Sequence, residues 1–98
     1  MKNKTPYDGV INKLFKSRWT DNLALAPIDK QRAQLYKTLK DQVGGFWSGH
    51  TAYNLAVDGG FLVDGNSNTF KKLTSCGEDF MLTCNKDWKK DVRDKNGN

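Results

Sequence analysis

The sequence predicts an α+β fold, mainly helical, in which three to four helices accompany one β-hairpin. Apolar residues recur with helical spacing in several stretches, and two short runs, 61–63 and 69–73, flank a Gly/Asn-rich turn at 64–68. Ninety-eight residues suit one domain, expected at 1–84. A basic, partly helical or mobile tail is expected at 85–98.

The first helix is predicted at residues 6–19. Pro6 suits the first helical position, and Asp8 places a negative charge near the exposed N–H groups. An amphipathic stripe follows, formed by Tyr7, Val10, Ile11, Leu14 and Phe15. We therefore expect one face of this helix to be buried.

The second helix is predicted at residues 30–43, with Asp29 as its cap and the glycine pair 44–45 as its end. Its inward side chains are expected to be Tyr36, Leu39 and Val43. The other faces carry Lys30, Arg32, Lys37 and Lys40. These cations suit a solvated surface at least as well as a binding face.

The third helix is predicted at residues 49–57, capped by Ser48 and ended by the glycine pair 59–60. Phe46 and Trp47 precede it. Two large aromatic residues in a turn are more often anchors packed under neighbouring helices than a binding platform, and we expect them to be anchors here.

In the second strand of the hairpin, alternation puts Lys71 with Leu73 on one face and Phe70 with Lys72 on the other. If Leu73 faces the core, Phe70 lies on the outer face beside a lysine. There it could contact a protein groove or unstacked bases. The alternative, which is equally consistent with the sequence, is that Phe70 folds back over the first helix.

The fourth helix is predicted to start at Ser75, which forms a capping box with Glu78. Its packing stripe recurs every four residues, at Cys76, Phe80, Cys84, Trp88 and Val92. Eight helical residues separate the two cysteines by about 12 Å, beyond the roughly 7 Å of a disulfide. We therefore expect two free thiols.

The segment around the hairpin resembles the wing of bacterial MarR- and PadR-like winged-helix regulators. The matching residues are Gly60, Phe61, Leu62, Lys71, Leu73, Thr74, Gly77, Glu78 and Phe80. The resemblance, confined to about residues 48–81, implies a helix-turn-helix binding module. Residues 48–58 would then be its recognition helix.

This resemblance implies a set of nucleic-acid-binding residues on the third helix and the wing: His50, Thr51, Tyr53, Asn54, Lys71 and Lys72. Asn and His can hydrogen-bond base edges, and the two lysines would contact phosphates. The recognition segment itself contains no Lys or Arg.

Composition excludes several other classes of protein. His50 is the only histidine, and neither a zinc-type cysteine pair nor a Gly-rich phosphate loop is present. We expect no enzyme, metal or cofactor. No apolar run approaches the roughly 20 residues that span a bilayer, so we expect no membrane partner and a cytoplasmic location.

The net charge of +5 favours polyanions or acidic protein surfaces, although it serves solubility equally well. We expect a small nucleic-acid-binding protein, working within a DNA-processing or regulatory complex. The alternative is an accessory protein, of the kind that phages and mobile elements encode, that modulates a host protein. Its contacts would be Phe70, Trp88, Lys89 and Lys90. A third possibility is a subunit that acts through self-association.

Overall fold

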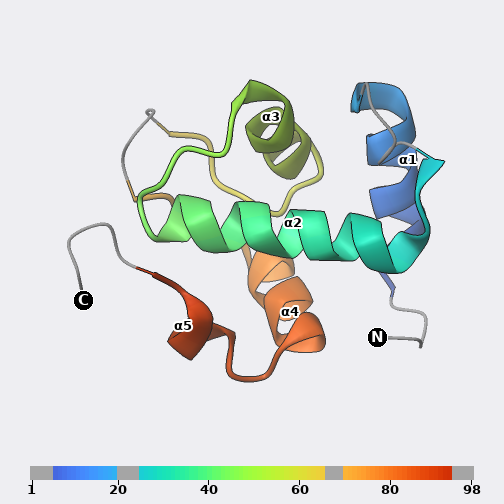
Figure 1. Ribbon diagram of the computed structural model, residues 1–98. Coiled ribbons are helices and arrows are strands. Elements are labelled where there is room, and N and C mark those ends of the chain that lie inside the picture. Colours follow the sequence, from blue (N-terminus) through green and yellow to red (C-terminus); the bar gives the residue numbers. More distant parts are fainter. Residues whose placement is uncertain (1–5, 20–24, 66–69, 94–98) are drawn as a thin grey trace.

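The computed structural model describes residues 6–19, 25–65 and 70–93, and these residues form five helices. The helices are α1 (Asp8–Arg18), α2 (Ile28–Val43), α3 (His50–Asp58), α4 (Ser75–Cys84) and α5 (Trp88–Asp91). α2 runs through the middle of the molecule, and α1, α3 and α4 pack around it (Figure 1). The four helices predicted from apolar spacing are thus confirmed.

The boundaries of α1, α2 and α3 differ from the prediction by one or two residues, whereas the stripe predicted from Cys76 to Val92 is interrupted after Cys84 and resumes in the separate helix α5. α2 begins at Ile28, so Asp29 lies in its first turn, where Oδ1 accepts the Lys30 N–H at 3.0 Å. α4 is capped by Thr74, whose hydroxyl accepts the Gly77 N–H at 3.0 Å. A threonine hydroxyl caps as well as a serine hydroxyl, so residue type alone could not choose between Thr74 and Ser75.

The predicted β-hairpin is wrong, and with it the α+β, winged-helix-like fold class. The described residues contain no strand, only one antiparallel bridge between Leu62 and Leu73. Beside this bridge, Val63 N–H donates to the Lys72 carbonyl at 2.9 Å. The Lys71 N–H, on the same segment as Lys72, donates to the Gln42 carbonyl of α2 at 2.9 Å instead of to the 61–63 segment. The pairing of the two segments therefore does not extend beyond the single bridge.

Phe61 lies at the centre of the core. Its ring is 5.8 Å from that of Tyr7 and 5.5 Å from that of Phe80, measured between centroids. The buried cluster comprises Ile11, Phe15, Leu35, Leu39, Tyr53, Leu55, Ala56, Phe61, Leu62, Phe80, Met81 and Trp88. Every helix therefore contributes to one core, and both cysteines are free thiols, as expected.

Some predictions fall outside the described residues. These are the turn residues 66–68, the first residue of the return strand, Thr69, and the end of the tail, 94–98. Within the described part of the tail, Trp88 belongs to the buried cluster and α5 packs on α4.

Candidate functional site

Three of the four predicted recognition residues lie on the outer side of α3. His50, Thr51 and Asn54 are exposed, whereas Tyr53 is buried. The His50 ring meets the ring of Trp47 edge-on, with centroids 5.3 Å apart. The outer side of α3 is therefore polar and carries no cation of its own, because the helix contains no Lys or Arg and its one charged residue is the exposed Asp58.

Lys71 is not on the surface, although the prediction placed it against phosphates. Its side chain is 5% exposed, and Nζ lies 5.8 Å from the ring centroid of Trp47 and 5.7 Å from that of Tyr53. Two aromatic faces can hold a largely desolvated ammonium group by cation–π attraction. Lys71 thus secures the segment after residue 70 against α3.

Tyr53 is fixed at its hydroxyl as well as at its ring. The hydroxyl donates to the Asp64 carboxylate and accepts the N–H of Gly65 at 2.8 Å. Burial and the hydrogen bond to Asp64 raise the pKa of Tyr53 above its usual value. Tyr53 therefore stays neutral at physiological pH and organises the loop, instead of facing a nucleic acid.

The residues on either side of Lys71 point outward, as strand-like alternation requires. Phe70 and Lys72 are exposed, and Phe46 and Val63 are exposed close by. Three backbone hydrogen bonds of 2.9 Å bring these segments together: Lys71 to Gln42, Phe46 to Asp41, and Val63 to Lys72. We call the group Phe46, Val63, Phe70 and Lys72 the end surface, because it lies at the C-terminal end of α2.

A second cation approaches the end surface from the C-terminal segment. Gly44 packs so closely on Arg93 that a Cβ atom at Gly44 would lie 1.8 Å from the Arg93 carbonyl oxygen. Arg93 is exposed, and among the described residues neither it nor Lys72 forms an ion pair. The nearby Asp91 and Lys40 pair with each other, with Nζ 3.4 Å from Oδ2.

The predicted partner residues of the tail divide into two groups. Trp88 is buried in the core, so it cannot serve as an exposed anchor. Lys89 and Lys90 are exposed on α5, and Lys89 Nζ lies 5.8 Å from the Trp88 ring centroid. The predicted partner residues therefore do not form one group: Phe70 belongs to the end surface, whereas Lys89 and Lys90 lie on α5.

The sequence reasoning missed two exposed members of the end surface, Phe46 and Val63. Both Phe46 and Trp47 were expected to be packed anchors; Trp47 packs against the core, but Phe46 is 41% exposed, so the expectation is wrong for Phe46. Two neighbouring residues of one turn thus differ in exposure, and nothing in the sequence distinguishes them.

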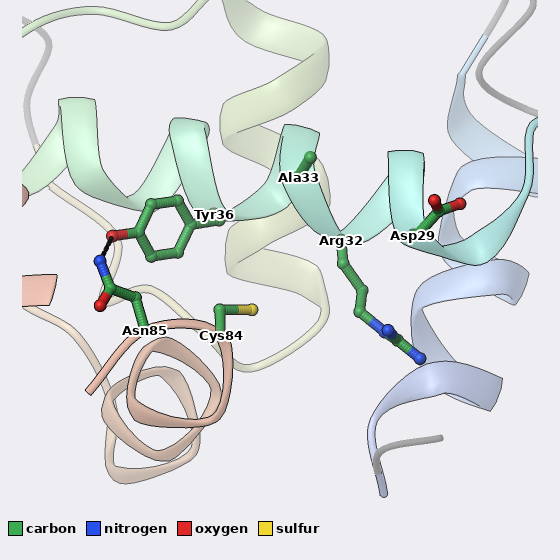
Figure 2. A pocket seen from close by; sticks show the side chains of 6 residues that line it. All are labelled: Asp29, Arg32, Ala33, Tyr36, Cys84 and Asn85. Atoms are coloured by element: carbon green, nitrogen blue, oxygen red, sulfur yellow. Dashed lines mark hydrogen bonds between the residues drawn. The ribbon is translucent and has the colours of Figure 1, made fainter. Parts of the chain in front are cut away.

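A separate groove lies between α2 and α4 (Figure 2). Its volume is about 360 Å³, and its lining residues are Asp29, Arg32, Ala33, Tyr36, Cys84 and Asn85. Burial raises the pKa of the Cys84 thiol to about 11, so Cys84 is an uncharged thiol near neutral pH. A protonated thiol is a poor nucleophile, so the groove contains no activated cysteine.

Within the described residues, no three His, Cys, Asp or Glu side chains gather where they could hold a metal ion. In the same part of the chain, none of the helices has the length and apolar character required to cross a bilayer. No protein-family model matches the chain, and neither the curated proteins nor the solved structures include a significant match.

Proposed function

We propose that this chain is a non-enzymatic accessory protein that binds a protein partner through its end surface. The observation that carries the proposal is that three exposed apolar residues, Phe46, Val63 and Phe70, stand on segments that backbone hydrogen bonds join near the C-terminal end of α2. Aromatic side chains in such groups supply much of the binding free energy at protein interfaces.

The charges around the end surface favour an acidic partner. Lys72 belongs to the surface and Arg93 lies beside it. The exposed Asp64, which follows Val63, already accepts the Tyr53 hydroxyl, and Asp91 of the tail is paired with Lys40. An excess of cations around an apolar centre accelerates association with an acidic surface and suppresses binding to basic ones. The partner is therefore expected to offer an apolar pocket bordered by Asp or Glu.

Replacing Phe70 with Ala tests this proposal. We expect the change to weaken capture of the partner by roughly 30-fold, because a central aromatic contact contributes about 2 kcal/mol or more. The measurement is quantitative mass spectrometry of proteins retained from nuclease-treated lysate on the immobilised chain, followed by titration of the recovered partner.

Leu82→Ala is the matched control. Leu82 is 52% exposed on α4, close to the 46% of Phe70, but lies outside the end surface. Its replacement should leave capture unchanged. Equal retention by wild type and Phe70→Ala, or equal losses in both variants, would contradict the proposal.

Nucleic-acid binding is a second candidate, and the C-terminal segment favours it. Within residues 85–93, the exposed cations Lys86, Lys89, Lys90 and Arg93 outnumber the two acidic residues, Asp87 and Asp91. Contacts between such cations and phosphates are independent of base sequence. This candidate involves no hairpin wing and relies on phosphate contacts, supplemented by the exposed His50, Thr51 and Asn54 of α3.

The double variant Lys89→Gln with Lys90→Gln tests the second candidate. If both lysines contact phosphates, the slope of log affinity against log salt for single-stranded DNA should become shallower by roughly 1.4. Fluorescence anisotropy at several salt concentrations measures this slope. Lys13→Gln with Lys16→Gln, on exposed positions of α1, removes the same charge elsewhere and should leave the slope unchanged. An absence of DNA binding by wild type rejects the candidate.

A further inference from the structure

The groove between α2 and α4 has walls that are fixed by side-chain hydrogen bonds. At one end, the Tyr36 hydroxyl accepts the Asn85 side-chain amide at 3.1 Å (Figure 2). The same hydroxyl donates to Asp91 Oδ2 at 2.8 Å. At the other end, Arg32 Nε donates to Asp8 Oδ1 at 2.8 Å. A cavity whose walls are already held in place loses little conformational entropy when a ligand enters.

Part of the groove lining is apolar and uncharged. The Ala33 methyl group, the Tyr36 ring and the protonated Cys84 thiol supply it. A volume of about 360 Å³ lies at the lower end of the range of roughly 300–1,000 Å³ typical of small-molecule sites. The groove therefore suits a ligand with a short apolar body.

Among the described residues, the ionic side chains of the groove, counted together with Asp8, sum to one negative charge. Arg32 is neutralised by Asp8, to which it donates two hydrogen bonds. Asp29 is exposed at the same end and forms no ion pair within the described residues. Its Oδ1 accepts the Lys30 N–H at 3.0 Å, and a carboxylate has further lone pairs that can accept a donor.

We infer that this groove is a binding site for an organic cation, namely an ammonium or guanidinium group carried on a short apolar body. The body lies against Ala33, Tyr36 and Cys84, and the cation donates to the Asp29 carboxylate. Charge-assisted hydrogen bonds of this type are about twice as strong as those between neutral groups. The site is separate from the end surface, because Asp29 lies in the first turn of α2 and the end surface at its last.

Benzylammonium is the probe, with benzoate and benzyl alcohol as ligands of similar shape but different charge. Titration of the ¹⁵N-labelled protein should give saturable NMR shifts at the Ala33 amide and the Asn85 side chain with benzylammonium alone. Alkylation of Cys84 by N-ethylmaleimide should slow as the groove fills. A capped tripeptide with a central lysine serves as a further arm, since tighter binding of the peptide than of butylammonium would identify a protein side chain as the source of the cation.

Two variants test the charge and the shape of the groove separately. Asp29→Asn should weaken benzylammonium binding by about tenfold or more, and Ala33→Leu should block it by placing a larger side chain in the lining of the groove. Asp41→Asn, which removes the same charge from α2 outside the groove, should bind like wild type. Binding of benzoate or benzyl alcohol as strong as that of benzylammonium, an absence of saturation, or unchanged affinity in Asp29→Asn would overturn the inference.

Discussion

Replacing Gly77 with Ala is expected to lower the free energy of unfolding by more than about 3 kcal/mol, or to prevent folding altogether. Gly77 lies in the first turn of α4, directly against the backbone of Phe61. A Cβ atom at this position would stand 2.0 Å from the Phe61 carbonyl oxygen. Backbone cannot move aside as a flexible side chain can, so α4 would have to leave the core. Urea unfolding followed by circular dichroism measures the loss.

Gly9→Ala is the matched comparison and is expected to stabilise the protein in the same urea unfolding measurement. Gly9 lies in α1, and a Cβ atom there would meet nothing within 4 Å. The change should raise the free energy of unfolding by roughly 0.4–1 kcal/mol, because alanine restricts the unfolded chain more than glycine does. Similar effects of the two substitutions would show that the packing of α4 on Phe61 is not as described.

Replacing Asp8 with Ala is expected to lower the free energy of unfolding by about 3–5 kcal/mol. The change removes the carboxylate that receives Arg32 Nε and Nη2, at 2.8 and 2.5 Å. Because the Arg32 side chain is only 4% exposed, water cannot replace the lost partner. The large effect therefore comes from a cation left buried without its main counter-ion. The same urea titration measures it.

Asp58→Ala is the matched control for this ion pair. Asp58 contacts Arg18 at 2.9 Å, but both side chains are more than 40% exposed. Exposed pairs contribute about 0–1 kcal/mol, since water and salt screen them. A loss in Asp8→Ala no greater than that in Asp58→Ala would contradict the inference that burial makes the first pair important.

The helices could be predicted because the apolar spacing and the glycine residues that define them lie within a few positions of one another in the sequence. The stripe from Tyr7 to Phe15 and the glycine pair 59–60 depend only on residues within a few positions of one another. The prediction of a hairpin was wrong because one backbone amide of the expected return strand, that of Lys71, bonds to an acceptor outside the hairpin. The Gln42 carbonyl at the end of α2 takes the Lys71 N–H, and no local pattern reveals an acceptor almost thirty residues away.

The same contrast applies to the candidate site. Alternation correctly separated Phe70 and Lys72 from Lys71 and Leu73, and the structure shows that the first pair faces solvent. Lys71 was nevertheless assigned to phosphates on the strength of its charge. Lys71 is buried against the rings of Trp47, in the turn between α2 and α3, and Tyr53, in α3. Both residues are distant from Lys71 in the sequence, so the local pattern does not reveal these contacts. Trp88 likewise joins a core assembled from every helix.

The way this core is assembled has a consequence for biosynthesis. Phe15 of α1 and Trp88 of α5 belong to one buried cluster, and Tyr7 packs edge-on against Phe80 of α4. During translation, the apolar faces of α1 and α2 remain exposed until the residues that cover them, in α4 and α5, have been synthesised. Contacts between residues so far apart in sequence also slow folding. Chaperones can therefore bind the exposed apolar surface of the nascent chain until α4 and Trp88 have left the exit tunnel and the core can form.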